Sequence, residues 1–70
     1  MRLSARNQLH GIVVEIDEGA VTTTVKVRLQ GGDVVTSSIT KEAATELGLA
    51  PDKSVVVIVK ASDVMIGAED

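Results

Sequence analysis

The chain has 70 residues, a net charge of −3 and neither cysteine nor aromatic residues, so it forms one domain at most (residues 1–70), without disulfide bonds. Nucleic-acid binding is disfavoured, because seven Lys and Arg residues are scattered among ten acidic ones and no aromatic ring is present to stack on a base. No apolar stretch reaches membrane-spanning length and the amino terminus lacks a signal-peptide core, so we expect a cytoplasmic protein without a membrane partner.

Three strands are expected in the first half of the chain. "HGIVVEI" (10–16) is a short apolar run that reads as the first strand. "VTTTVKVRL" (21–29) alternates strictly, with mainly valines on one face and Thr, Lys and Arg on the other. "QGGD" (30–33) predicts a hairpin turn that leads into a third strand, "VVTSSIT" (34–40).

At the start of the second half of the chain, the spacing of apolar residues changes from that of a strand to that of a helix. "TKEAATELG" (40–48) predicts a short helix with Thr40 as its N-cap and Gly48 just past its end. "SVVVIVK" (54–60) and "DVMI" (63–66) predict a fourth and a fifth strand. Three strands, a helix and two strands follow the order of the OB-fold. The expected fold class is therefore all-β with one short helix, built as a five-stranded OB-like Greek-key barrel.

The composition also predicts assembly. Without aromatic residues the core must be built from Val, Ile, Leu and Ala, and small cores without staples usually need oligomerisation. The 54–60 stretch is apolar on both faces, as expected of a strand that packs inward and against a partner. We therefore expect a homo-oligomer.

The polar stretch "SARNQL" (4–9) has two interpretations. It can be a solvated amino-terminal segment with a capping serine, and the residues alone favour this one. Alternatively, the Ser4 hydroxyl and successive backbone N–H groups, including that of Ala5, form a concave nest for an anion. Arg6 would then supply positive charge and forked hydrogen-bond donors.

Two further stretches allow the same choice. Lys60 is either a polar strand end with a snorkelling stem or a second cation beside the anion, with Ala61 N–H and Ser62 donating. Thr40 is fully explained as an N-cap, although hydroxyls near a helix start also favour anions.

No spacing suggests a catalytic triad, a carboxylate pair or a phosphate loop, and a single histidine argues against a structural zinc site. We therefore expect no enzyme activity, no cofactor and no metal ion bound directly by side chains.

Four stretches in order resemble the molbindins, the small Mop proteins whose molybdate-binding domain is also called TOBE-type. The most specific is "SARNQL" followed by one residue and Gly (4–11). The others are "GAVTTTVKV" (19–27), "ITKEAATELGL" (39–49) and "VIVKASDVMI" (57–66). The resemblance covers nearly the whole chain. It implies an OB-like barrel assembled as a hexamer, a trimer of dimers, with oxyanion sites between subunits.

The resemblance also implies site residues. One kind of site would use Ser4, Arg6, Lys60 and the Ala61 N–H of one subunit, with Thr40 arriving from its neighbour. Related sequences often carry serine where this chain has Ala43, and commonly lysine where it has His10. The Ala43 departure would leave one side-chain donor fewer.

Every side chain proposed for this site is a cation or a hydroxyl, which suits a fully deprotonated tetrahedral dianion. Two cations against two negative charges limit the cost of burying the anion. The resemblance thus implies a protein that binds molybdate or tungstate for storage or homeostasis. The alternative is an oligomeric interaction or regulatory module that senses the oxyanion and binds a protein partner.

Overall fold

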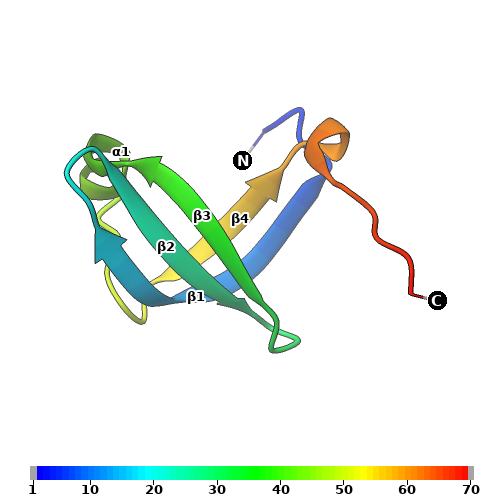
Figure 1. Ribbon diagram of the computed structural model, residues 1–70, viewed down its shortest axis with the longest axis horizontal. Helices are drawn as coiled ribbons and strands as arrows, with labels where there is room; N and C mark the ends of the chain where they lie inside the picture. The colour runs from blue at the N-terminus through cyan, green and yellow to red at the C-terminus, as the bar shows by residue number, and fades with distance from the viewer. Residues whose placement is uncertain (1, 70) are drawn as a thin grey trace.

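The computed structural model describes residues 2–69 as a curled antiparallel sheet with a short helix at one end (Figure 1). The elements are β1 (Asn7–Glu18), β2 (Thr22–Leu29), β3 (Val34–Thr40), α1 (Lys41–Glu46), β4 (Ser54–Val59) and the 3-10 turn η1 (Ala61–Asp63). Within these residues no helix is long and apolar enough to cross a membrane.

The strand order is β3-β2-β1-β4, and every pair is antiparallel. Hairpins connect the first three strands in sequence, and β4 returns after α1 to lie beside β1 (Figure 1). Three such strands with a fourth beside the first form a Greek key. The expected fold class, all-β with one short helix and OB-like topology, is confirmed, but the sheet is a half-barrel.

The predicted fifth strand over residues 63–66 is wrong. Asp63 belongs to η1, and no strand follows it in the described chain. The Asp63 N–H donates to the Lys60 carbonyl (2.9 Å) and the Val64 N–H to the Ala61 carbonyl (3.3 Å). This turn directs the following residues away from the sheet, where they find no ladder partner (Figure 1). The described part of the chain therefore has four strands, and β3 and β4 are its two edges.

The long strand β1 bends in the middle and thereby curls the sheet. Its first half pairs with β4 from Asn7 to Ile12, and its second half pairs with β2 from Gly11 to Glu18. The register with β2 shifts between Val13 and Glu15, as in a β-bulge, and bulges increase local bend and twist. β1 therefore joins the two walls of the half-barrel: one wall is its pairing with β4, and the other is its pairing with β2.

The core lies where the two walls meet. Val13, Val25 and Val27 are buried and pack together, and partly buried residues from β1, β2, β3 and β4 surround them. The alternation predicted over residues 21–29 is confirmed, because Thr23, Val25 and Val27 share the buried face of β2. Three buried valines make a thin core for a chain of 70 residues.

One buried position in this core is polar. The side chain of Thr23 is 0% exposed, and its Oγ1 has no hydrogen-bond partner among the described residues. A buried hydroxyl without a partner costs about 1–3 kcal/mol.

Replacing Thr23 with valine should therefore raise the free energy of unfolding by about 1 kcal/mol. Thermal unfolding followed by circular dichroism checks this, with Thr24→Val, on the opposite face of β2, as control; an unchanged or lower midpoint for Thr23→Val would contradict it.

Both ends of α1 form as predicted. The Ala43 N–H donates to the Thr40 hydroxyl at 3.0 Å, so Thr40 is the N-cap. Gly48 adopts φ +62°, and its N–H donates to the Thr45 carbonyl while the Leu49 N–H donates to the Ala44 carbonyl. These two bonds form the Schellman motif that glycine favours after a helix. The helix is held locally, at the end of β3.

Candidate anion-binding site

Two segments far apart in the sequence meet at one corner of the sheet. Asn7 at the start of β1 lies opposite Val59 at the end of β4, and the Asn7 Nδ2 donates to the Val59 carbonyl at 3.2 Å. The residues just outside this pair therefore leave the sheet side by side. We call Ser4, Ala5, Arg6, Lys60, Ala61 and Ser62 the Arg6–Lys60 corner.

Ala5 anchors the amino-terminal side of the Arg6–Lys60 corner. Its side chain is only 8% exposed, whereas those of Ser4 and Arg6 on either side of it are exposed. The Gln8 Nε2 also donates to the Ala5 carbonyl at 3.5 Å. Asn7 and Gln8 thus tie the segment to the sheet, a role that the sequence did not reveal. Ser4 and Arg6 are left free to meet a ligand.

The carboxyl-terminal side of the corner is a tight turn. Lys60 precedes η1 in extended conformation, with φ −66° and ψ 140°, and its side chain is exposed. Ala61 and Ser62 open η1, and the first N–H groups of a helical turn have no acceptor within that turn. This side therefore offers one ammonium group, one hydroxyl and backbone N–H donors over three consecutive residues.

The two cations of the corner are not neutralised by the described chain. Within residues 2–69 the one ion pair joins Lys26 and Glu15 at 3.6 Å, on the β1–β2 part of the sheet. Arg6 and Lys60 therefore have no carboxylate within ion-pairing distance in this part of the chain. Their guanidinium and ammonium groups remain available to an anion.

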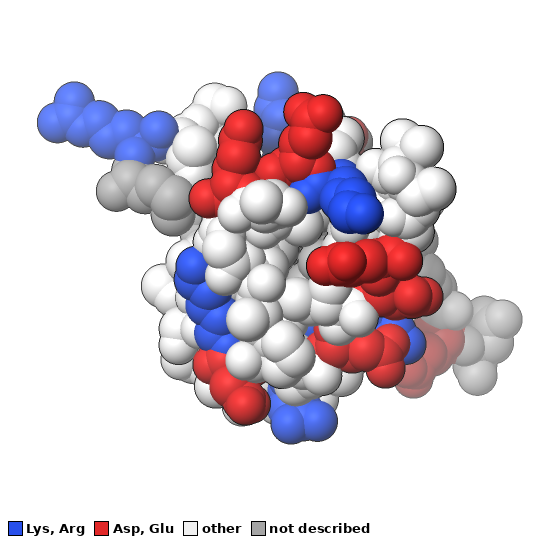
Figure 2. Space-filling view, turned by 90° about the vertical axis from the view of Figure 1, so that its left-hand side faces the viewer, with Lys and Arg blue, Asp and Glu red and all other residues white. Residues whose placement is uncertain are grey.

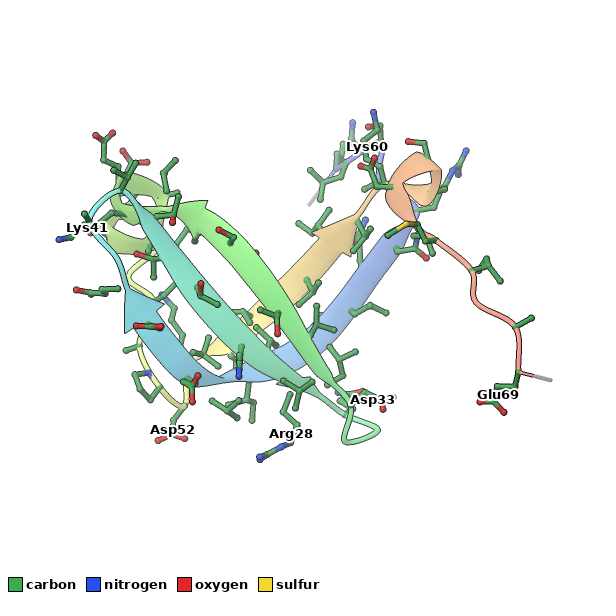
Figure 3. All side chains as sticks on the ribbon, in the orientation of Figure 1. Arg28, Asp33, Lys41, Asp52, Lys60 and Glu69 are labelled. Carbon is green, nitrogen blue, oxygen red and sulfur yellow. The ribbon has the colours of Figure 1, made fainter. Side chains whose placement is uncertain are left out.

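Thr40 does not lie at this corner. It caps α1 beside Lys41, and Figure 3 shows Lys41 and Lys60 at opposite sides of the molecule. A cavity of about 600 Å³ lies next to Thr40, lined also by Ala20, Val21, Lys41, Glu42, Thr45 and Glu46. The structure thus brings six of the seven predicted site residues to one corner and leaves Thr40 at the other end.

The α1 end of the molecule is mainly acidic. Figure 2 shows this face, where Asp and Glu side chains are spread with Lys and Arg between them. Exposed acids of β1 and α1 contribute to this end: Asp17, Glu18, Glu42 and Glu46. A dianion would be repelled there by the carboxylates. The Arg6–Lys60 corner is the better anion site within one chain.

The two departures from the family pattern lie at different places. Ala43 is half-buried in α1, and its N–H donates to the hydroxyl of the N-cap Thr40. His10 is exposed on β1, opposite Val56 of β4. Among the described residues no group of three or more His, Cys, Asp or Glu side chains could hold a metal ion.

Comparison with known proteins shows the family. The TOBE domain model matches residues 3–66. The probable molybdenum-pterin-binding protein of Haemophilus influenzae is 44% identical over 69 residues, which are 99% of this chain and 100% of that protein. MopII of Clostridium pasteurianum superposes with a TM-score of 0.90 at 42% identity, over 96% of this chain and 100% of that one.

A third relative was solved with its ligand. The cytoplasmic molybdate-binding protein ModG, with molybdate bound, superposes with a TM-score of 0.94 at 51% identity. The match covers 99% of this chain and 49% of that chain. The Haemophilus influenzae protein and ModG are both described as binding proteins. The chain is therefore a member of the TOBE-domain family and, within it, of the molbindins, or Mop proteins.

Proposed function

We propose that this protein binds molybdate at the Arg6–Lys60 corner, without catalysis. The observation that carries the proposal is the meeting of Arg6 and Lys60, neither paired with a described carboxylate, where β1 begins and β4 ends. The relatives described as molybdenum-pterin-binding and molybdate-binding proteins support the choice of ligand.

The donor set explains the preference for an oxyanion. Molybdate is a tetrahedral dianion whose oxygens accept several hydrogen bonds. Arg6 and Lys60 donate from cations, Ser4 and Ser62 from hydroxyls, and Ala5 and Ala61 from backbone N–H groups. Charge-assisted bonds are about twice as strong as neutral ones, so the two cations dominate. The carboxylate of η1, Asp63, follows Ser62 and forms no ion pair with Arg6 or Lys60 among the described residues.

The site is completed between subunits of a homo-oligomer, in this proposal a hexamer built as a trimer of dimers. Thr40 lies too far from the corner to serve it within one chain, and it reaches the corner of a neighbouring subunit instead. The thin core of three valines is a second argument for assembly, because such a core gives a small domain little stability. The proposed role is storage or homeostasis of molybdate and tungstate in the cell.

Calorimetric titration beside native mass measurement tests the proposal. A hexamer that takes up molybdate and tungstate, with sites in a fixed ratio to subunits, is the expected result. Many moderately tight sites per oligomer indicate storage, whereas a few tight sites with a large conformational response indicate the sensing role. A folded monomer at micromolar concentration would rule out sites shared between subunits.

Selectivity gives a separate prediction. Sulfate is also a tetrahedral dianion, but its shorter bonds to oxygen reach fewer of the fixed donors at once. At equal concentration sulfate should therefore leave molybdate binding unchanged, whereas tungstate, which is nearly the same size as molybdate, should compete. Competition titration with each anion measures this. Equal competition by sulfate would show that size does not select the ligand.

A further inference from the structure

Two side-chain amides of "SARNQL", those of Asn7 and Gln8, form hydrogen bonds at the Arg6–Lys60 corner without belonging to its donor set. The Asn7 bond to the Val59 carbonyl is 3.2 Å long, and the Gln8 bond to the Ala5 carbonyl is 3.5 Å long. Asparagine is a poor strand former, so its place as the first residue of β1 needs a reason besides strand propensity. Asn7 is half-buried and makes the shorter bond, so its bond is the stronger candidate for a role at the corner.

The Asn7 bond joins the immediate neighbours of the two cations. Asn7 directly follows Arg6 in the sequence, and Val59 directly precedes Lys60. The Val59 carbonyl belongs to the planar peptide unit that ends at the Lys60 N–H. A hydrogen bond to its oxygen therefore fixes the plane from which Lys60 leaves the sheet. One side chain thus links β1 and β4 at the point where both cations begin.

The next peptide unit of this strand end is held by η1. The Lys60 carbonyl accepts a hydrogen bond from the Asp63 N–H at 2.9 Å. The peptide bonds of the described residues are all trans, and in a trans unit the C=O and N–H point in opposite directions. The Ala61 N–H therefore points away from η1. Both peptide units that flank Lys60 are held before any ligand binds.

Gln8 acts in the same way on the other strand, but more weakly. The Ala5 carbonyl belongs to the peptide unit that ends at the Arg6 N–H, so the Gln8 bond orients the unit from which Arg6 leaves. This bond is near the outer limit of hydrogen-bond length, and Gln8 is exposed. Burial of the Ala5 side chain therefore does most of the anchoring on this side. The link between the two strands depends on Asn7.

We infer that Asn7 is a positioning residue of the anion site and that it sets the size selectivity of this site. Its amide donates to the protein rather than to a ligand, and it fixes the separation of Arg6 and Lys60 in advance. Size can select among tetrahedral dianions only where the donors cannot close on a smaller one. A site held in advance also avoids the cost of ordering its side chains on binding. The inference rests on the proposed function and names the residue that makes the site rigid.

Asn7→Leu tests the inference, because leucine has nearly the same size as asparagine and no charge but cannot donate a hydrogen bond. In the ligand-free oligomer, the backbone order parameters of Arg6 and Lys60 from NMR relaxation should fall from about 0.85 to about 0.6, and that of Thr40 should stay unchanged. Gln30→Leu is the matched control, since it removes an exposed amide from the β2–β3 turn, and it should behave as the unaltered protein. If Asn7→Leu does not assemble, Asn7→Val replaces it, because valine has a higher strand propensity and also lacks a donor.

Calorimetric titration of the same oligomers measures the effect on binding. Molybdate affinity of Asn7→Leu should fall by about threefold to tenfold. Sulfate affinity should fall less, so the ratio of the two affinities should also fall. In oligomers that already carry Lys60→Ala, Asn7→Leu should lower molybdate affinity by less than about twofold, because the cation that it positions is gone.

Three outcomes overturn the inference. The first is that Arg6 and Lys60 have the same order parameters in Asn7→Leu as in Gln30→Leu. The second is an unchanged ratio of molybdate to sulfate affinity. The third is an affinity loss that is equal with and without Lys60→Ala, as expected of a structural role alone. Failure of the proposed function looks different: the unaltered protein then binds no molybdate, and the order parameters, measured without ligand, still decide whether Asn7 positions the corner.

Discussion

Replacing Arg6 with alanine should lower the affinity for molybdate by about tenfold to a hundredfold. A hydrogen bond to a charged group contributes about 1.5–3 kcal/mol, and each 1.4 kcal/mol is a factor of ten. Lys60→Ala should act similarly, because it removes the second cation of the same corner. The oligomer should survive both changes, since both side chains are exposed and outside the core. Calorimetric titration of oligomers of confirmed mass measures the loss.

The chain offers a matched control for each variant. Arg28→Ala removes an exposed arginine from β2, and Lys26→Ala removes a lysine whose exposed ion pair with Glu15 contributes at most about 1 kcal/mol to stability. Each control changes the net charge by the same amount as its test variant but lies outside the corner. If Arg6→Ala binds molybdate as tightly as Arg28→Ala, "SARNQL" is a solvated segment and the proposed site is wrong.

Gly11→Ala should strongly destabilise the protein. A Cβ at this position would lie 2.6 Å from the Arg28 carbonyl oxygen and 2.6 Å from a Val27 methyl group. The backbone neighbour cannot move without opening the β1–β2 ladder at the bend. Overpacking of this kind costs about 1–3 kcal/mol, which lowers the melting temperature of a domain this size by roughly 4–20 °C.

Circular dichroism melting at fixed protein concentration measures this effect. Gly31→Ala is the control, because a Cβ there meets no atom within 4 Å. A melting temperature for Gly11→Ala equal to that of Gly31→Ala would mean that β1 and β2 can move apart at Gly11 without loss of stability. Gly11 ends the most specific stretch of the family pattern, and its role is to let the strands approach closely.

Local features of the fold could be predicted from the sequence, and distant pairings could not. The alternation along β2 and both caps of α1 depend on residues within one turn or one strand of each other, so their pattern is visible in the chain. "DVMI" has the composition of a strand, but a strand also needs a partner edge. Composition does not say whether that edge lies in the same chain, and the fifth strand was therefore predicted wrongly.

The candidate site was found through family resemblance rather than through its residues alone. Ser4 and Arg6 read first as a solvated segment, because nothing local shows that β4 ends beside them. The pairing of Asn7 with Val59 supplies this proximity, and these residues are 52 positions apart. The roles of Asn7 and Gln8 were missed for the same reason, since their acceptors are defined only once the strands have paired.

That same pairing sets an order of events for a newly made chain. The β1–β2 and β2–β3 hairpins join neighbouring segments, whereas β4 must close a loop of about fifty residues to reach β1. Long loops close later, because closing them costs conformational entropy before the new contacts can compensate for that cost. The Arg6–Lys60 corner is therefore among the last parts of the fold to form. A chain still emerging from the ribosome therefore has a sheet before it has the Arg6–Lys60 corner, because Lys60 is released only after β1, β2 and β3.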